Sequence, residues 1–223
     1  EEGTAENIDD AAAAPSAELL LSYTGEQAAI ITAGQVQFVA AHHEEEESAE
    51  EAHDEDEHEL PELSALTISG AGIKVTNTNG HFSVLANSAT QLVPYELLEE
   101  GAIPDAEPLG LSIIETYPAL LLEEGETESV VVAFSGGEAR IYEGTTLEAE
   151  HSQTCTTVNS TAQNAEFALI SCDNTTFSVK LEEGVSEHTI EINTITGIST
   201  AVEWATRADM FVGLGADNKF YVL

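Results

Sequence analysis

The stretch VVVAFSGGEARIYEG, residues 130–144, consists of two apolar, β-branched runs separated by Gly136 and Gly137. Paired glycines accept the left-handed backbone angles of tight hairpin turns, so this stretch predicts a β-hairpin. The same pattern occurs four more times, which predicts an all-β chain. The other predicted hairpins are AAIITAGQVQFVAA (28–41, turning at Gly34), HFSVLANSATQLVPYEL (81–97, at Asn87 and Ser88), FALISCDNTTFSVKLEEG (167–184, at Asp173 and Asn174) and MFVGLGADNKFYVL (210–223, at Gly215 to Asp217).

The hairpins recur at a nearly regular interval. Successive turns are about 54, 49, 37 and 43 residues apart, and the longest interval falls to about 36 without an acidic insertion of roughly 18 residues. Repeats near 40 residues, each with a central hairpin and flanking strands, are typical of β-propeller blades. The flanking strands are predicted at ELLLSY (18–23), SALTIS (64–69), LSIIETY (111–117) and HTIEI (188–192).

These repeats predict a single β-propeller domain of about five blades over residues 18–223, preceded by a flexible segment at 1–17. One blade cannot bury both faces of its small sheet, so the blades must stack around an axis. If strand 18–23 completes the last blade, the five blades close a ring; otherwise they are part of a larger propeller. The alternative architecture is a β-sandwich, which short strands at this density also permit.

The composition is strongly acidic, with 42 Asp and Glu residues against five Lys and Arg residues and a formal charge of −37. Nucleic acids and anionic membranes bind clustered basic residues, so neither is an expected partner. No run of about 18 apolar residues is present, so no segment is expected to insert into a membrane. Such acidity is also typical of adaptation to a saline habitat, where salt screens the self-repulsion. The polar stretch EEGTAENIDDAAAAPSAE (1–18) indicates a periplasmic or extracellular protein.

The segment 42–62 is the extreme of this acidity, and it holds four of the seven histidines. Eleven acidic residues and no basic residue lie between positions 42 and 59. Imidazole together with carboxylate suits Zn²⁺, Ni²⁺ or Cu²⁺, and Zn²⁺ takes about four ligands. The segment is therefore predicted to be a mobile flap that binds zinc through His42, His43, His53 and His58. The alternative is a solvated acidic insertion that does not bind metal.

Two histidines outside the flap are further candidate ligands. His81 opens the second hairpin, one blade after the insertion, so it is expected to face the same end of the ring. His151 lies in the loop-like segment EAEHSQTC (148–155). The two cysteines, Cys155 and Cys172, are predicted to form one disulfide if the protein is exported; the alternative is two buried thiols in a cytosolic protein.

Motifs of common catalytic sites are absent from the sequence. It contains no GxSxG, HExxH, GxxxxGK[ST] or GxGxxG. With so many carboxylates, chance acidic pairs are inevitable, so none identifies a glycosidase site. The protein is therefore not expected to be an enzyme.

Three stretches resemble the periplasmic zinc chaperones of the AztD type. The hairpin 130–143, with GEA at its turn and an aromatic residue two positions after Arg140, is similar to a hairpin of that family. So are the segment 155–181, in which two cysteines bracket a strand, and the hairpin 210–223 with its FVG. The family's members are β-propellers that pass zinc to the solute-binding protein of an ABC importer.

The resemblance implies that the flap histidines, together with His81, bind zinc. The family segment after the first cysteine usually holds a histidine, but Thr156, Thr157 and Val158 stand there in this chain, so no blade ligand carries over at that point. The predicted function is an exported, non-enzymatic protein that collects Zn²⁺ and transfers it to such a solute-binding protein. The alternative is an extracellular interaction or structural module of a salt-adapted organism, with Ca²⁺ as a further option for its ligand.

Overall fold

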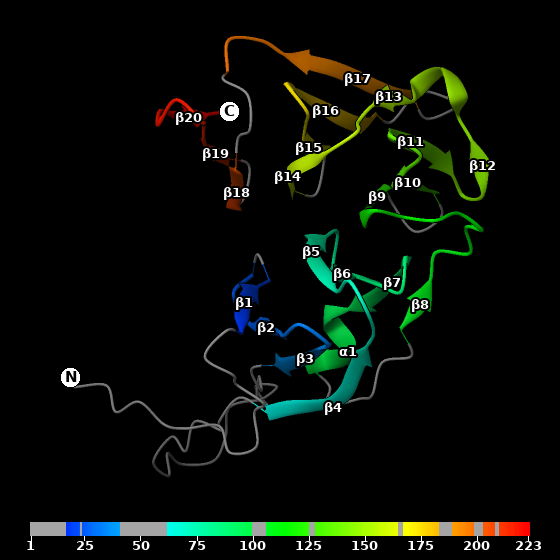
Figure 1. Cartoon of the computed structure of the whole chain (residues 1–223), viewed down its shortest axis with the longest axis vertical. Coiled ribbons are helices and arrows are strands. Elements are labelled where there is room, and N and C mark those ends of the chain that lie inside the picture. Colours follow the sequence, from blue (N-terminus) through cyan, green and yellow to red (C-terminus); the bar gives the residue numbers. More distant parts are fainter. Residues whose placement is uncertain are drawn as a thin grey trace, which may run out of the picture.

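The computed structural model describes residues 17–22, 24–40, 62–99, 106–124, 128–164, 167–182, 189–198, 203–207 and 210–223. Within these residues the chain forms five antiparallel β-sheets, one short α-helix and one 3₁₀ helix (Figure 1). No helix in this part of the chain has the length and apolar character needed to span a membrane. Each sheet is built from consecutive strands, so the chain completes one sheet before it begins the next.

Sheet 1 contains β1 (Glu18–Leu21), β2 (Gln27–Ile31), β3 (Gln35–Ala40) and β4 (Glu62–Ser69). Sheet 2 contains β5 (Lys74–Thr78), β6 (His81–Ala86), β7 (Ala89–Pro94) and β8 (Glu107–Pro108), with helix α1 (Tyr95–Glu99) after β7. Sheet 3 contains β9 (Tyr117–Glu124), β10 (Glu128–Ser135), β11 (Glu138–Glu143), β12 (Thr146–Leu147) and β13 (Gln153–Thr154), with the 3₁₀ helix η1 (Ala149–His151). Sheet 4 contains β14 (Val158–Gln163), β15 (Phe167–Cys172), β16 (Thr175–Glu182) and β17 (Thr189–Ile195). Sheet 5 contains β18 (Glu203–Arg207), β19 (Met210–Leu214) and β20 (Phe220–Val222).

The turns between central strands have the backbone angles that the sequence predicted. Gly136 and Gly137, between β10 and β11, have φ of 63° and 81°. Asn87 and Ser88, between β6 and β7, have φ of 54° and 64°, and Asp173, between β15 and β16, has φ of 49°. Positive φ is uncommon outside glycine, asparagine and aspartate, so these short turns fix where each strand reverses. The predicted hairpins are confirmed.

The five sheets are arranged as a five-bladed β-propeller, as predicted, and the β-sandwich alternative is wrong. In Figure 1 the first strand of each sheet lies nearest the centre. Hydrogen bonds between these inner strands cross the axis: the Thr78 hydroxyl of β5 donates to Gln163 Oε1 of β14 at 2.7 Å and accepts the Leu121 N–H of β9 at 2.5 Å. The Thr76 and Thr161 hydroxyls are 3.1 Å apart. Sheets 2, 3 and 4 are therefore joined at the centre by polar contacts.

Apolar residues fill the four interfaces between successive sheets. Each interface has its own cluster of buried side chains, which removes apolar surface from water and drives the sheets together. Members from the two sides of the interfaces are Phe38 and Phe82 for sheets 1 and 2, Leu92 and Val131 for sheets 2 and 3, Ile141 and Ile170 for sheets 3 and 4, and Leu169 and Phe211 for sheets 4 and 5.

The predicted completion of the last blade by the N-terminal strand is wrong. Strand β1 pairs with β2 in sheet 1, with Glu18 opposite Ile31 and Leu21 opposite Ala28. The connection from 22 to 26 is short and internally bonded, with the Gln27 N–H donating to Ser22 Oγ at 3.1 Å. A strand joined by so short a turn pairs with its neighbour in sequence, because that pairing closes the smallest loop.

The predicted strand at 111–117 is also wrong. The strand begins at Tyr117, and the residues before it bond to turns of other strands: Glu115 N–H donates to Ser88 O at 3.2 Å, and Thr116 N–H to Phe134 O at 2.9 Å. The alternating apolar side chains of Leu111 and Ile113 pack between sheets 2 and 3. Their spacing therefore reflects contact between sheets and not pairing within one.

Candidate functional site

The end of the propeller that carries the β3–β4 connection is the candidate site, and we call it the insertion end. Ala40, the last residue of β3, pairs with Glu62, the first of β4. Neighbouring strands lie about 5 Å apart, so the segment between them leaves and re-enters the fold at nearly one point. The described residues stop at 40 and resume at 62. Four of the predicted zinc ligands therefore lie outside the described residues, namely His42, His43, His53 and His58.

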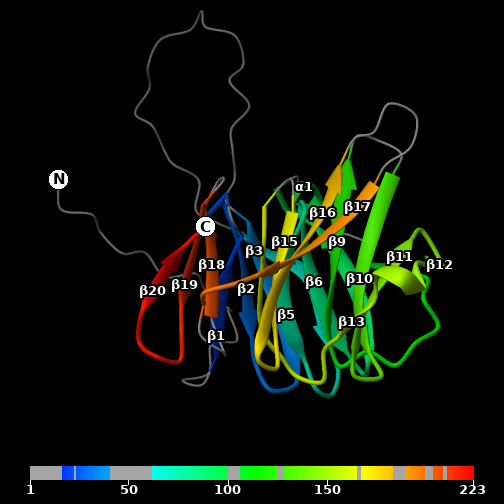
Figure 2. The same cartoon turned by 90° about the horizontal axis from the view of Figure 1, so that it is seen from above.

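His81 also lies at the insertion end. It is the first residue of β6, paired with Thr78 and Pro94 on either side. The Tyr95 N–H, at the start of α1, donates to Gly80 O at 2.9 Å, which ties the helix to the β5–β6 turn. Figure 2 shows α1 at the upper end of the molecule.

The contacts of His81 leave one ring nitrogen suited to metal binding. Nδ1 lies 2.5 Å from the backbone oxygen of Asn79, which can only accept, so Nδ1 carries the proton. In the neutral ring Nε2 then carries the lone pair. Fixing a histidine tautomer by a backbone carbonyl is the arrangement that metal-binding histidines commonly have. The Asn79 side chain in turn donates to Glu123 Oε2 at 3.1 Å, which braces the turn against sheet 3.

His151 lies at a cavity between sheets 3 and 4. The cavity has a volume of about 230 Å³, and Glu143 and Glu148 line it together with His151. His151 Nε2 is 3.7 Å from the exposed carboxylate of Glu150. The cavity lies near the insertion end, because Ser129 and Glu143 stand at the ends of β10 and β11 that border the β9–β10 connection.

The described part of the fold does not bring the predicted ligands together. No group of three or more His, Cys, Asp or Glu side chains within it is placed to hold a metal ion. His81 belongs to sheet 2, whereas His151 faces sheets 3 and 4. Each offers a single imidazole, and a set of about four zinc ligands needs residues from the segment 42–62.

A second cavity, which the sequence did not predict, lies beside the axis. Its volume is about 320 Å³, and uncharged residues of β1, β5, β14 and β18 line it, among them Asn77, Gln163 and Trp204. No carboxylate or imidazole is among its lining residues, so it lacks the ligands that a divalent cation prefers. In the sequence, the feature that could have indicated this cavity is the set of Thr and Gln residues in β5 and β14, because inner strands that meet at the axis need polar partners.

Glu115 carries a buried carboxyl, 4% exposed, at the end of the propeller opposite to the insertion end. Its Oε2 atom has no hydrogen-bond partner among the described residues. Burial raises the pKa of the Glu115 carboxyl above its ordinary value, and hydrogen bonds from Thr90 offset only part of that effect. A buried acid of this kind is more easily held neutral than charged.

Glu115→Gln should therefore make the protein more stable at neutral pH. Burial raises the pKa of Glu115 in the folded state. Below the unfolded-state pKa the carboxyl is protonated in both states, so it does not destabilise the wild-type protein. As the pH rises through the folded-state pKa, the buried carboxyl ionises and the wild-type protein loses stability. The gain from the substitution should vanish at the acid end and grow as the pH rises above about 4, the ordinary pKa of a glutamate. Urea unfolding of both proteins at constant salt measures it. Glu107→Gln, at an exposed position, is the control; equal pH dependence in both variants would contradict the prediction.

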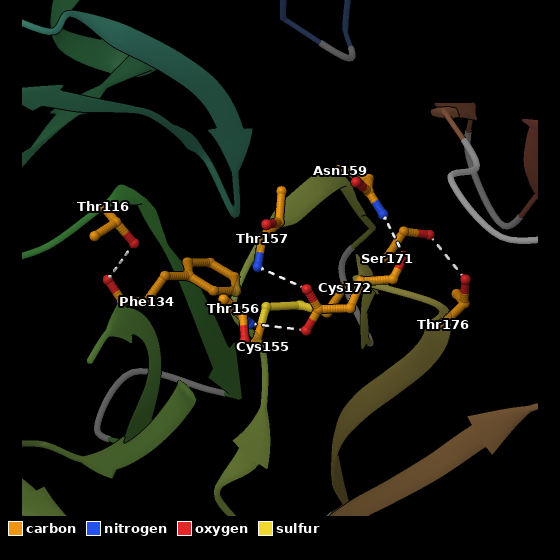
Figure 3. Close-up of a disulfide and its surroundings, with 10 residues drawn as sticks. Thr116, Phe134, Cys155, Thr156, Thr157, Asn159, Ser171, Cys172 and Thr176 are labelled. Carbon is orange, nitrogen blue, oxygen red and sulfur yellow. Dashed lines mark hydrogen bonds between the residues drawn. A yellow bond between two sulfur atoms is a disulfide. The ribbon is translucent and has the colours of Figure 1, made fainter. Parts of the chain in front are cut away.

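The predicted disulfide is confirmed. Cys155 and Cys172 are bonded, with their Cα atoms 5.1 Å apart, and both are buried in the cluster between sheets 3 and 4 (Figure 3). The carboxylate of Asp173 accepts the Thr156 and Thr157 N–H groups at 2.8 and 3.0 Å. Disulfides persist mainly in oxidising compartments, so the bond accords with an exported protein.

Comparisons with known proteins identify the fold and no family. The sequence matches no known family and no curated protein. Two structures of AztD from Citrobacter koseri match 92% of this chain with 12% identity, at TM-scores of 0.63 and 0.59. Hsv2 from Kluyveromyces lactis matches 93% of it with 8% identity, at a TM-score of 0.51. The chain spans about 60% of the length of these proteins. At such identities the likeness concerns the fold.

Proposed function

We propose that this protein is an exported zinc-binding propeller that collects Zn²⁺ through its His/acid segment and passes the ion to a partner protein. One observation carries the proposal: the segment 42–62 is inserted at a hairpin connection on the same end of the fold as His81, on a propeller that shares its architecture with AztD. Four imidazoles within 17 residues supply the ligand type and number that zinc needs.

Collection and release both follow from this ligand set. The eleven carboxylates of the segment concentrate cations, and the histidines bind zinc as neutral rings. His81, held by Asn79 with Nε2 available, would add one ligand from the rigid fold. Since the other ligands come from a single inserted segment, they can be replaced one at a time by ligands of a partner. Transfer then needs no step in which the zinc ion is free.

The partner should be recognised by charge and by ligand type. A formal charge of −37 steers association toward a positively charged surface. To take the ion, the partner must offer histidines of its own. The solute-binding protein of a zinc ABC importer in the periplasm has this chemistry, as the resemblance to the AztD-type chaperones implies.

Zinc titration by calorimetry near pH 7.5 tests the proposal. The intact protein should bind zinc with micromolar affinity or better, equivalent to about −8 kcal/mol. A variant lacking residues 42–59 should lose that binding. Three residues then remain between Ala40 and Glu62, enough for a hairpin turn, so the fold should survive. Binding should also weaken below about pH 6.5, as protons compete for the imidazoles.

Matched variants separate imidazole ligands from general acidity. Replacing the four segment histidines with Gln should abolish binding, whereas replacing the four acids at 44–47 with Gln should preserve most of it. His81→Gln should weaken binding by about tenfold, and His151→Gln should leave it unchanged. No zinc binding by the intact protein would defeat the proposal. Stabilisation by Ca²⁺ and not by Zn²⁺ would favour the structural alternative.

A further inference from the structure

The turn between β5 and β6, directly before His81, consists of Asn79 and Gly80. The chain has nine asparagines, and Asn79 is the only one that a glycine follows. Gly80 is exposed and has φ of 63°, a backbone angle that favours glycine. A Cβ built at Gly80 would meet no other part of the described chain within 4 Å, so this side of the turn is open.

This turn places a nucleophile beside a side-chain amide. In an Asn-Gly pair the glycine nitrogen can attack the Cγ atom of the asparagine, because no Cβ on the glycine hinders the approach. A hydrogen bond donated by that nitrogen would oppose the attack. The Gly80 N–H donates to no acceptor in the described part of the chain. The attacking nitrogen is therefore neither shielded by a side chain nor engaged in a hydrogen bond.

The other eight asparagines lack this arrangement, because each precedes a residue that carries a Cβ. Asn87 precedes Ser88, and its Oδ1 atom also accepts the Ala71 N–H at 2.9 Å. Asn164 is engaged in a similar way, since its Oδ1 atom accepts the Phe167 N–H at 3.0 Å. These asparagines are internal controls within the same protein.

We propose that Asn79 is a site of spontaneous covalent modification, namely deamidation through a cyclic imide. The Gly80 nitrogen bonds to Asn79 Cγ, the Cγ–Nδ2 bond breaks, and the Gly80 N–H proton leaves with the amide group as ammonia. Water then opens the imide at one of its two carbonyl carbons. Opening at Cγ leaves aspartate, and opening at the backbone carbon leaves isoaspartate, in which the chain runs through Cγ. Water is the only reactant, and nothing is oxidised or reduced.

Both products remove a hydrogen bond that holds the turn. Asn79 Nδ2 donates to Glu123 Oε2 at 3.1 Å, and a carboxylate in its place cannot donate and repels the Glu123 carboxylate. In isoaspartate the chain also gains one carbon, and the Asn79 carbonyl that lies 2.5 Å from His81 Nδ1 becomes part of a free carboxylate. The group that fixes the His81 tautomer is then displaced. The consequence for zinc rests on the proposed function, whereas the modification itself does not.

Incubation of the intact protein at mildly alkaline pH, followed by digestion and mass spectrometry, tests the modification. Asn79 should gain the mass difference between NH₂ and OH before any other asparagine does, and labelling by an isoaspartate methyltransferase should map to the same peptide. Asn79→Gln is the matched control, because glutamine keeps the amide but needs a larger ring to cyclise. Circular dichroism confirms that the protein stays folded. An Asn79 that remains unmodified, or that converts no faster than Asn87, would overturn the proposal.

Comparison of fresh and modified protein tests the link to His81. Nitrogen NMR of the metal-free protein should show one neutral tautomer of His81 when fresh and a mixture after modification, with no change in incubated Asn79→Gln. Zinc affinity should fall by up to about tenfold, the loss expected for His81→Gln. An unchanged tautomer and affinity in fully modified protein would overturn this link. Fresh protein that binds no zinc would instead defeat the proposed function and leave the modification standing.

Discussion

Phe82→Ala should lower the free energy of unfolding by about 3–5 kcal/mol, the largest loss we expect from a single substitution. Phe82 is fully buried at the interface of sheets 1 and 2. Its ring centroid lies 5.4 Å from that of Phe38 and 4.8 Å, edge to face, from that of Tyr95. Truncation loses the transfer energy of the ring and both aromatic contacts, and it leaves a cavity that β-strands fixed by hydrogen bonds cannot collapse to fill.

Urea unfolding at constant salt and low protein concentration measures this loss. Phe220→Ala is the matched control, because the same atoms are removed from a ring that is 76% exposed, and the change should stay within about 0.5 kcal/mol. Equal losses in the two variants would show that sheets 1 and 2 are not held together by this cluster. Since Phe82 follows His81 in β6, the variant should also disturb the insertion end and weaken any zinc binding that depends on it.

Replacing Cys155 and Cys172 together with Ala should lower the free energy of unfolding by about 3 kcal/mol. The bond joins residues 17 apart, and without it the unfolded chain regains the entropy of that loop. Both sulfurs are also buried in the cluster between sheets 3 and 4, so their removal leaves small voids there. Urea unfolding of the double variant and of the wild type gives the difference.

Reduction provides the internal control for this prediction. A reducing agent should destabilise the wild type by a similar amount and leave the double variant unaffected. A loss below about 0.5 kcal/mol in the variant would mean that the Asp173 carboxylate and the apolar cluster hold the two sheets without the bond. Zinc binding should persist in the folded double variant, because the disulfide lies at the end opposite to the segment 42–62.

The strands and turns of this protein were largely predictable from local sequence. The turns at Gly136 and Gly137, at Asn87 and Ser88, and at Asp173 use residues that accept positive φ, and the structure confirms each of them. The strand predicted at 111–117 failed because alternation of apolar residues also arises when an irregular segment packs between two sheets. Period alone does not distinguish these two environments.

The candidate site was predicted only as a set of residue types. Composition singled out the histidines of the segment 42–62, and the spacing of hairpins placed His81 on the neighbouring blade. The tautomer of His81 could not be predicted, because it depends on the position of the Asn79 carbonyl across a turn. Nor could the separation of His81 from His151, which depends on how the sheets are set around the axis.

The sequence by itself determined the all-β class, the five hairpins and the acidic composition, because each depends on residue types within a short span. Only the tertiary structure decided that β1 belongs to sheet 1, that Glu115 is buried, and that Leu21 and Phe220 are exposed. Those properties depend on which surfaces meet between segments far apart in the chain. The free energy of such contacts is set by burial, which no local pattern specifies.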